Sequence, residues 1–430
     1  KLQKVRYRVN NHVLNVAHYC KDKEIKVDKF IPIVPAYKPP PPPDIETNKE
    51  AHKKWKKETR NAHNADCLNF KRSVRTRAQL ETAEKFKEDV FYLCWSFDYR
   101  GRAYPIQAFL TPQDTDFGKA MIRFADESPV TQDAEDWLAI QVATTYGLDK
   151  ATMDERIAWS LDNHELITLI ATDPTGCIPE WESADEPWQF MSACHEYYHC
   201  IIKRDKTTTG LMVAVDATCS GLQVLAGLAK DQSTASLVNV CPADTPSDAY
   251  KAVANEAKKY LPERMHSWMT RGTCKRTVMT IPYNATKDSS RKYIKQSLKE
   301  QGIDPTKDEL TQVVNAVYQS MDAIVPGPMQ VMRWIKQHVG QYIRDGATEV
   351  EWVTPSGFTV NQRRDKVNIQ RVRLQLLGNV SIRLDKGSGT PCPIRHKSST
   401  APNFIHSLDA SILHCSFQQF NEPFTVIHDS

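Results

Sequence analysis

The sequence predicts a mostly helical α+β protein. Helical spacing of apolar residues extends over 118–170, 187–203, 246–261 and 308–342, whereas stretches with strand character are few and short. Hydrophobic residues make up 40% of the 430 residues and charged residues 25%, a balance that supports buried cores in two or three domains. No apolar run is long enough to cross a bilayer, and the N-terminus lacks a secretory signal.

The first ninety residues are predicted to be helical and basic, with a proline-rich interruption. Residues 4–20 have the apolar spacing of a short amphipathic helix, and residues 48–90 are rich in Ala, Lys, Arg and Glu. Between them, Pro39 to Pro43 lack the N–H groups that a helix needs and favour an extended spacer. The second helix has a basic face that is either solvated or in contact with phosphate, formed by Lys53, Lys54, Lys56, Lys57, Arg60, Lys71, Arg72, Arg75 and Arg77.

Two hairpin-like segments are predicted near the C-terminal end. Residues 349–353 and 358–360 flank the sequence Thr-Pro-Ser-Gly, which is typical of a hairpin turn. Further on, apolar and polar residues alternate, which predicts a strand with one basic face; the apolar members are Val372, Leu374 and Leu376, and the polar ones are Arg371, Arg373 and Gln375.

Charge is distributed unevenly along the chain. Residues 1–90 carry 21 basic against 12 acidic side chains, residues 91–263 carry 13 against 26, and residues 264–430 carry 22 against 14. Two basic blocks around an acidic one fit a protein that binds a polyanion at particular faces. The alternative is that they are ordinary surface charge. The eleven cysteines include no CxxC pair, so we expect neither a disulfide framework nor a zinc ribbon, and a reducing compartment is favoured.

His195 to His199 spell HEYYH, a match to the HExxH motif. In metalloproteases the two histidines bind zinc and the glutamate activates water. No extended zinc-protease signature follows in the sequence. A pair of structural histidines is therefore the favoured interpretation, and a zinc metalloprotease is kept as an alternative.

Two aspartates follow apolar runs that are predicted to be strands. Asp216 comes after Met212 to Val215, and Asp429 comes after residues 424–427 and His428. Two carboxylates at strand ends are the ligands that a two-metal phosphoryl-transfer site requires.

Between the aspartates, Arg271, Lys275, Met279 and Tyr283 recur every four residues and therefore share one face of a predicted helix, next to Arg276. Two cations, a thioether and a phenol in one stripe can bind a triphosphate at one end and a base at the other. A surface helix with chance cations is the alternative.

Five sequence blocks in order resemble those of the single-subunit, phage-type DNA-directed RNA polymerases, which include mitochondrial enzymes. Asp216–Gln223 (DATCSGLQ) resembles polymerase motif A, Arg271–Tyr283 resembles motif B, and His428–Ser430 (HDS) resembles motif C. Two more matching blocks are Asp98–Tyr104 (DYRGRAY) and Ala401–Ser407 (APNFIHS). The forms of motifs A and C are phage-like, so a bacteriophage source is expected.

The resemblance implies a role for each matching residue. Asp216 and Asp429 would hold two Mg²⁺ ions, with the Ala217 carbonyl as a further ligand. Arg271 and Lys275 would bind the triphosphate, and Lys275 could protonate the leaving pyrophosphate.

Other matching residues would contact the nucleotide or the nucleic acid. Tyr283 and His406 would help to read the ribose 2′-OH, which distinguishes RNA precursors from DNA precursors. Arg276 and Met279 would complete the nucleotide site of motif B, and Arg100 and Arg102 would lie near the hybrid and the active centre.

The implied fold is a cupped right hand with palm, fingers and partial thumb. Its expected parts are a thumb-like segment with the proline-rich spacer at 1–90, a palm with motif A and helical insertions at 91–260, fingers with motif B at 261–345, a specificity-hairpin-like region at 346–400 and a palm return with motif C at 401–430. Within residues 360–384, Arg371 and Arg373 would read promoter bases, since arginine can donate two hydrogen bonds to guanine.

The implied activity is transcription of phage genes from NTPs. The expected partners are double-stranded promoter DNA, the template strand, nascent RNA and NTPs, with no membrane, and the protein is expected to be a monomer. It would act in the cytoplasm of an infected bacterium, with the mitochondrial matrix as the alternative. A DNA polymerase of similar fold is the rival activity.

The sequence also departs from the family. Asn284 follows Tyr283 where glycine is common, and Asp288–Ser290 replaces a more aromatic stretch. The family's large N-terminal promoter domain and its C-terminal extension have no counterpart, so we expect this chain to be part of a longer protein.

Overall fold

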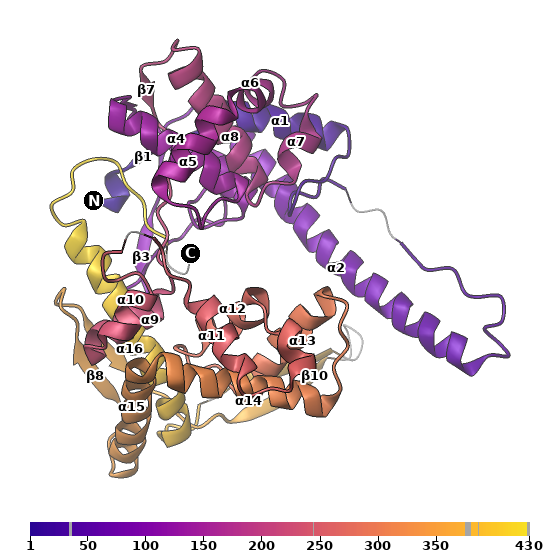
Figure 1. Ribbon diagram of the computed structural model, residues 1–430, viewed down its shortest axis with the longest axis vertical. Coiled ribbons are helices and arrows are strands. Elements are labelled where there is room, and N and C mark those ends of the chain that lie inside the picture. The colour runs from indigo at the N-terminus through magenta and orange to yellow at the C-terminus, as the bar shows by residue number, and fades with distance from the viewer. Residues whose placement is uncertain (34–36, 244, 375–379, 386, 428–430) are drawn as a thin grey trace. The chain divides into compact units, whose positions relative to one another are not determined.

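The predicted mostly helical α+β class is confirmed by the computed structural model (Figure 1). The structure describes residues 1–430 apart from 34–36, 244, 375–379, 386 and 428–430. Two compact units divide the described residues. Unit 1 contains Lys1–Ser96, Tyr104–Val215 and the described residues from Asn421 onward, and unit 2 contains Phe97–Ala103 and Asp216–Phe420.

Unit 1 begins with a strand where the sequence predicted a helix. A short 3₁₀ helix (η1, Leu2–Lys4) precedes β1 (Arg6–Val9), and α1 starts only at Asn11 and ends at Asp22. Tyr7 and Val9 are buried whereas Arg6 and Arg8 are exposed, which is the alternation of a half-buried strand. The prediction of one helix over residues 4–20 is therefore wrong in its first half, because β1 pairs with two distant strands, β2 (Phe91–Tyr92) and β5 (Ile122–Phe124).

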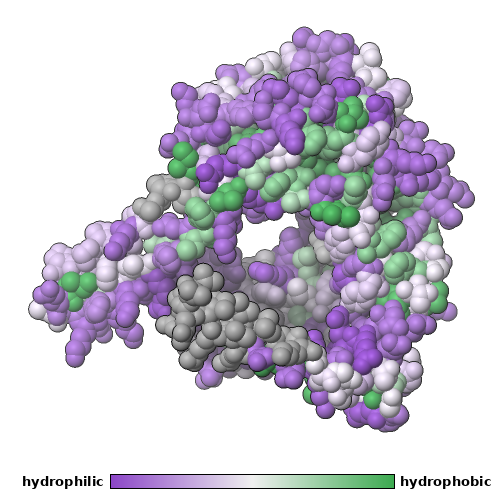
Figure 2. Space-filling model, turned by 180° about the vertical axis from the view of Figure 1, so that it is seen from behind, coloured by the Kyte–Doolittle hydropathy of each residue, from purple (hydrophilic) through white to green (hydrophobic). Residues whose placement is uncertain are grey.

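The helix predicted over residues 48–90 is α2, which extends from Lys49 to Phe86. The Asn48 side chain caps the start of the helix, because its oxygen accepts hydrogen bonds from the backbone amides of Glu50 and Ala51. Its buried residues all lie in the second half, between Ser73 and Ala83. The first half projects with a mostly hydrophilic surface, as Figure 2 shows.

The proline-rich segment lies along this helix. No helix or strand forms in the described residues from Tyr37 to Thr47, as the prolines predict. The Trp55 indole donates to the Pro39 carbonyl at 3.0 Å, and the Tyr37 amide donates to the Asp66 carboxylate at 3.2 Å.

The rest of unit 1 is a helical bundle with short strands at its edge. Its core includes Phe30, Phe117 and Trp188, whose rings lie 4.8–4.9 Å apart. The helix predicted over 118–170 is interrupted by β5 and β6, and the helix predicted over 187–203 is confirmed as α8 with a π-helical turn. Two strands, β3 (Trp95–Phe97) and β4 (Ala103–Pro105), have residues assigned to both units. The other elements are α3 (Asp116–Ala120), β6 (Ser128–Pro129), α4 (Gln132–Tyr146), α5 (Met153–Asp162), α6 (His164–Thr172), α7 (Ile178–Glu182), α8 (Pro187–Tyr197), η2 (Tyr198–Ile202) and β7 (Thr208–Thr209).

Neither of the strands predicted before the two aspartates forms in the described residues. Residues 212–215 are irregular, the Val215 side chain is 78% exposed, and the Ala214 amide donates to the Gln141 side chain instead of to a neighbouring strand. Residues 424–427 are irregular as well. Both predictions are wrong because an apolar run becomes a strand only where another strand pairs with it.

Unit 2 is built around a second helical core. Leu222, Val253, Val278, Leu298 and Val317 are fully buried in one hydrophobic cluster. The helix predicted over 246–261 is confirmed as α11, and the stretch 308–342 forms two helices that are separated at Val325. The elements are α9 (Ser220–Ala229), α10 (Gln232–Leu237), α11 (Ala249–Lys258), η3 (Glu263–Trp268), α12 (Arg271–Thr280), α13 (Lys287–Glu300), α14 (Lys307–Ile324) and α15 (Pro326–Arg344).

Two antiparallel hairpins and a long helix complete unit 2. β8 (Val350–Val353) and β9 (Thr359–Gln362) pair as predicted, and their turn uses Gly357 at φ 81°. β10 (Ile369–Leu374) pairs with β11 (Val380–Asp385), which confirms the strand at Arg371 and Arg373, whereas Gln375 and Leu376 lie outside the described residues. The helix α16 (Pro393–Ser416) packs against α15 and α9.

No helix in the described part of the chain combines the length and apolar character that crossing a bilayer requires.

Candidate active site

Three residues of the stripe predicted on the motif B helix, Arg271, Lys275 and Met279, lie on α12 (Arg271–Thr280). The prediction that Tyr283 shares this helix face is wrong, because the helix ends at Thr280 and Tyr283 lies in the turn that follows. The Thr270 hydroxyl caps the helix by accepting from the Thr273 amide, and the chain leaves the helix after Thr280, before Pro282. Thr273, Cys274, Thr277 and Val278 are buried on one side. Lys275, Arg276 and Met279 are exposed on the other, which leaves their side chains accessible to a ligand.

Arg271 is held in place at the start of this helix. Its Nε donates to the Asp248 carboxylate at 2.7 Å, and its guanidinium lies 5.3 Å from the centre of the Tyr250 ring. Burial opposes ionisation of Asp248, but hydrogen bonds from Lys251, Arg271 and Tyr250 prevail and lower the pKa of its carboxyl. The arginine is therefore positioned before any ligand arrives.

The two other cations of α12 differ in their surroundings. In the described residues, the Lys275 ammonium has no carboxylate within ion-pairing distance, and its side chain is exposed. The Arg276 guanidinium lies 4.2 Å from the centre of the Tyr293 ring on α13. Lys275 is thus available to an anionic ligand, while Arg276 is oriented by an aromatic face.

Tyr283 lies in the turn after α12 and contacts the start of α9. Its hydroxyl shares a hydrogen bond with the Ser220 hydroxyl at 3.2 Å. A Cβ atom at Gly221 would lie 3.0 Å from the Tyr283 ring, so glycine is needed for this close approach. Burial raises the pKa of the Tyr283 hydroxyl, which keeps it protonated.

Asn284 explains one departure from the family pattern. Its φ of 62° is in the left-handed region, which glycine adopts freely and asparagine tolerates better than other residues. The Asn284 amide also donates to the Ser398 carbonyl at 2.8 Å. Replacement of glycine by asparagine is therefore compatible with the backbone that places Tyr283.

His406 on α16 lies beside Tyr283. The two ring centres are 4.6 Å apart with planes inclined by 36°. The structure thus brings together two residues that the sequence separates by more than a hundred positions and that were predicted to act together.

A tight turn at residues 98–102 positions Arg100. The Asp98 carboxylate accepts hydrogen bonds from the Arg100 amide at 2.8 Å and from the Arg100 side chain at 2.6 and 2.9 Å. Burial raises the pKa of Asp98, but these bonds outweigh it, so the pKa is lowered and the carboxylate stays charged. Arg100 Nη1 in turn lies 2.6 Å from His406 Nδ1.

Arg102, from the same turn, forms a buried ion pair with Asp409. Its Nε and Nη2 contact the two carboxylate oxygens at 3.1 and 2.5 Å, and the Arg102 side chain is 2% exposed. Arg102 therefore anchors α16 one turn beyond His406. The sequence analysis included Asp98 in a matching block without a role, and it missed Asp409, although Asp409 is three residues from His406 on one helix and a buried arginine requires a carboxylate partner.

The predicted metal ligands are described only in part. Asp216 and Ala217 are exposed in an irregular segment before α9, and the Ala217 amide donates to the Asp216 carboxylate at 2.9 Å. Asp429 lies outside the described residues, and so do the side chains of Arg371 and Arg373. Carboxylate and carbonyl oxygens at Asp216 and Ala217 fit a hard cation such as Mg²⁺.

The HExxH residues of unit 1 are engaged in structural contacts. The Glu196 carboxylate accepts from Lys206 at 2.6 Å, Thr209 at 2.7 Å and Arg123 at 3.2 Å, which leaves it poorly placed to activate water. His199 pairs with Asp205 at 2.7 Å. Where the chain is described, no group of three or more His, Cys, Asp or Glu side chains is arranged to hold a metal ion.

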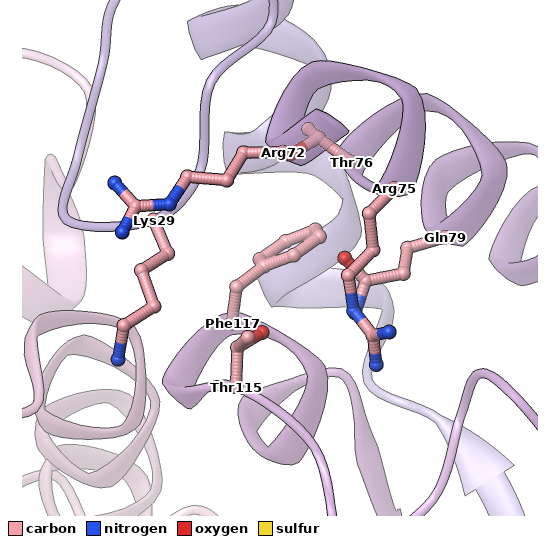
Figure 3. Close-up of a pocket in the computed structure, with 7 residues that line it drawn as sticks. All are labelled: Lys29, Arg72, Arg75, Thr76, Gln79, Thr115 and Phe117. Carbon is pink, nitrogen blue, oxygen red and sulfur yellow. The ribbon is translucent and has the colours of Figure 1, made fainter. Parts of the chain in front are cut away.

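A basic pocket of about 280 Å³ lies elsewhere in unit 1 (Figure 3). Lys29, Arg72 and Arg75 surround it, and Phe117 forms an apolar wall. Arg75 is neutralised by the buried Asp114 at 2.7 Å, but no ion pair involves Arg72 in the described residues. The pocket extends the basic face of α2 that the sequence predicted.

Comparisons with known proteins agree with the sequence resemblance. The family model of the DNA-dependent RNA polymerases matches residues 128–430. The chain is 28% identical to the DNA-directed RNA polymerase of Enterobacteria phage K11, covering all of this chain and 54% of that protein. It is 30% identical to the mitochondrial DNA-directed RNA polymerase of Mus musculus, covering 82% of this chain and 31% of that protein.

A third similarity, of 27% identity, is to the T7 RNA polymerase of Escherichia phage T7; it covers all of this chain and 56% of the phage protein. This chain therefore spans between about a third and somewhat more than half of the length of these relatives.

Proposed function

This chain belongs to the phage-type, single-subunit DNA-dependent RNA polymerases, and on that premise we propose that it synthesises RNA from NTPs on a DNA template. The observation that carries the proposal is the arrangement of Tyr283, His406 and Arg100, which come from three separate sequence blocks and lie together. Tyr283 follows α12, whose exposed face carries Lys275 and Arg276. An incoming nucleotide needs such neighbours, namely cations for its triphosphate and polar groups for its sugar.

We propose that Lys275 and Arg271 bind the triphosphate, with Arg276 and Met279 lining the same face. Lys275 is exposed and pairs with no carboxylate in the described residues, so its ammonium can neutralise phosphate charge and donate a proton to the leaving pyrophosphate. Arg271 is already oriented by Asp248 and loses little freedom on binding.

Sugar selection is assigned to Tyr283 and His406. Because the Tyr283 hydroxyl stays protonated and bonds to Ser220, it can act as a fixed polar group beside the ribose. A site that hydrogen-bonds a substrate hydroxyl rejects the analogue that lacks it, since a polar group is then left without a partner.

Asp216, the Ala217 carbonyl and Asp429 are proposed to hold two Mg²⁺ ions. When bound, the ions would activate the 3′-hydroxyl and stabilise the charge that develops on the phosphates. The chain's own contribution is a pair of exposed oxygen donors at Asp216 and Ala217.

The wider assignments follow from family membership. We propose a right-hand arrangement of palm, fingers and partial thumb, a monomer, and partners that comprise promoter DNA, template strand and nascent RNA. Arg371 and Arg373 on β10 are proposed to contact promoter bases. Phage and mitochondrial relatives both match, so the proposed location is the cytoplasm of an infected bacterium, with the mitochondrial matrix as the alternative.

Extension of RNA on a preassembled RNA–DNA scaffold tests the proposal. Asp216→Asn and Asp429→Asn should each abolish NTP addition while scaffold binding persists, because each change removes a metal ligand and leaves the basic surfaces intact. The matched control is Asp304→Asn, an exposed aspartate of unit 2 outside the motifs. Extension with dNTPs in preference to NTPs would favour the rival DNA polymerase, and near-normal extension by either variant would refute the metal assignment.

A further inference from the structure

The β8–β9 hairpin is bound along the length of α16 by buried polar contacts. Hydrogen bonds of 2.5–2.9 Å join the side chains of Gln362 and Trp352 and the Ser356 amide to a row of α16 side chains, namely Thr400, Asn403, Ser407 and Ser411. The four members of this row recur every three or four residues and are at most 6% exposed, so they form one buried face of the helix. The hairpin therefore has a fixed position on α16.

The end of the hairpin also contacts the turn at residues 98–102. Gly101 has φ 91° and no side chain, and the Phe358 ring fills the space beside it, since a Cβ atom at Gly101 would lie 3.1 Å from that ring. The centres of the Phe97 and Phe358 rings are 6.1 Å apart. Phe358 is itself held at the hairpin turn, where its amide donates to the Thr354 hydroxyl at 3.1 Å and its carbonyl accepts from the Thr354 amide at 2.9 Å. The Phe358 ring therefore limits where the backbone of the turn can lie.

Three elements of unit 2 thus contact one another in pairs. The turn is joined to α16 by Arg100, which lies 2.6 Å from His406, and by the buried ion pair of Arg102 with Asp409. The buried row joins α16 to the hairpin, and Phe358 joins the hairpin to the turn. Removal of the Phe358 ring would open one side of this arrangement and allow the Arg100 guanidinium to move relative to His406.

From these contacts, we propose that Phe358 is a positioning residue for sugar selection, which acts through Gly101 to keep the Arg100 guanidinium on His406 Nδ1. This role rests on the proposed function, in which His406 recognises the ribose 2′-OH. Recognition of one hydroxyl requires placement to within about 0.5 Å, which a side chain achieves only where its supporting residues are themselves packed. Asp98 fixes Arg100 relative to the turn, and Phe358 fixes the turn relative to α16.

Competitive incorporation of NTPs and dNTPs on the RNA–DNA scaffold tests this role. Phe358→Ala should lower the ratio of NTP to dNTP incorporation roughly three-fold, at the lower end of the effect of one lost hydrogen bond. Phe358→Leu, which keeps apolar bulk against Gly101, should restore most of the ratio. Because both changes act on the same contact, the double variant Phe358→Ala, Arg100→Met should select no worse than Arg100→Met alone. The matched control is Phe417→Ala, which removes a half-buried phenylalanine of unit 2 that contacts Phe420 and should leave the ratio unaltered.

A second measurement is independent of polymerase activity. Hydrogen exchange of the Gly101 and Arg102 amides, which donate to Asp98 at 3.0 and 3.2 Å, should become faster in Phe358→Ala but not in Phe417→Ala. If the unaltered chain extends no RNA while these amides still exchange faster, Phe358 braces the turn and the proposed function is what fails. Three results would each overturn the positioning role: unchanged exchange, a parallel fall of NTP and dNTP incorporation, or losses in Phe358→Ala and Arg100→Met that add in the double variant.

Discussion

Arg100 Nη1 and His406 Nδ1 lie 2.6 Å apart, although 306 positions separate the two residues in the sequence. A guanidinium can only donate hydrogen bonds, so His406 Nδ1 must accept, and the neutral ring then carries its proton on Nε2. The Asp98 carboxylate holds Arg100 in turn, because it accepts hydrogen bonds from the backbone amide and from the guanidinium of Arg100. The turn at residues 98–102 therefore determines the hydrogen-bonding character of a residue that is proposed to recognise ribose.

Arg100→Met should reduce the preference for NTPs over dNTPs. Without the Arg100 donor, the proton of the neutral His406 ring is no longer held on Nε2. The loss of one hydrogen bond corresponds to a decrease of roughly three- to ten-fold in the ratio of NTP to dNTP incorporation. Competitive incorporation of the two sugars on a scaffold measures the effect. Arg364→Met is the matched control, because Arg100 and Arg364 both lie against the Tyr99 ring, 5.7 and 5.5 Å from its centre. Arg364 donates to the Tyr99 hydroxyl at 2.7 Å, and among the described residues it is Arg100 whose guanidinium contacts His406. A selectivity that is the same in both variants would contradict the role given to Arg100.

Tyr283→Phe should raise dNTP incorporation and change NTP incorporation little. The substitution removes only the hydroxyl that bonds to Ser220, so the ring keeps its place beside His406 while the penalty against a missing 2′-OH is lost. The ratio of kcat/KM for dNTP and NTP is the measurement. Tyr293→Phe, on α13, removes a hydroxyl outside the proposed sugar site and should leave the ratio unaltered. If Tyr283→Phe also leaves it unaltered, the tyrosine serves packing alone.

Arg102→Met should destabilise the chain strongly. The substitution removes the buried ion-pair partner of the Asp409 carboxylate, which is itself only 14% exposed. Removal of one member of a buried ion pair typically lowers the free energy of unfolding by about 3–5 kcal/mol. The double variant Arg102→Met, Asp409→Leu should recover much of the loss, because an apolar pair replaces the uncompensated charge. Urea unfolding of the three proteins provides the comparison. A double variant that is no more stable than the single one would show that the ion pair is not the cause.

The sequence was most informative where structure depends on local spacing. Residues four apart correctly indicate the shared face of Arg271, Lys275 and Met279 on α12, whereas Tyr283 lies beyond the helix, which ends at Thr280 just before Pro282. The β8–β9 hairpin could also be predicted from the sequence, because its turn residues lie between the two strands that they join.

Predictions failed where distant segments decide the outcome. The strand β1 exists because Tyr7 pairs with residues near positions 91 and 124, which a four-residue stretch cannot reveal. Residues 212–215 are apolar enough for a buried strand, yet Val215 is 78% exposed. The ion pair of Arg102 with Asp409 spans 307 positions, so the motif letters indicate that Arg102 matters but not which carboxylate it binds.

A histidine cluster in unit 1 connects its stability to pH. His12 on α1 stacks on His195 of α8 with ring centres 3.7 Å apart, and His199 lies 4.6 Å from His195. In the described residues, the buried Nε2 of His12 has no hydrogen-bond partner. Burial, with the neighbouring histidines, lowers the pKa of His12 to about 3 and that of His195 to about 4, from an ordinary value of 6.5.

Unit 1 should therefore lose stability as pH falls below 6.5. The unfolded chain takes up protons on these histidines near pH 6.5, whereas the folded chain does not until pH is much lower, so acidification favours unfolding. Between pH 6.5 and 5, protonation linked to His12 alone should lower the free energy of unfolding by about 2 kcal/mol.

Urea midpoints across this pH range should fall less steeply for His12→Gln than for the unaltered chain. The control is His63→Gln, which changes an exposed histidine on α2 and should follow the unaltered chain. Asp116, whose pKa burial raises to about 6, acts in the opposite direction but is common to all three proteins, so it cancels in the comparison. Parallel curves for His12→Gln and the unaltered chain would show that the cluster is not the origin of the pH dependence.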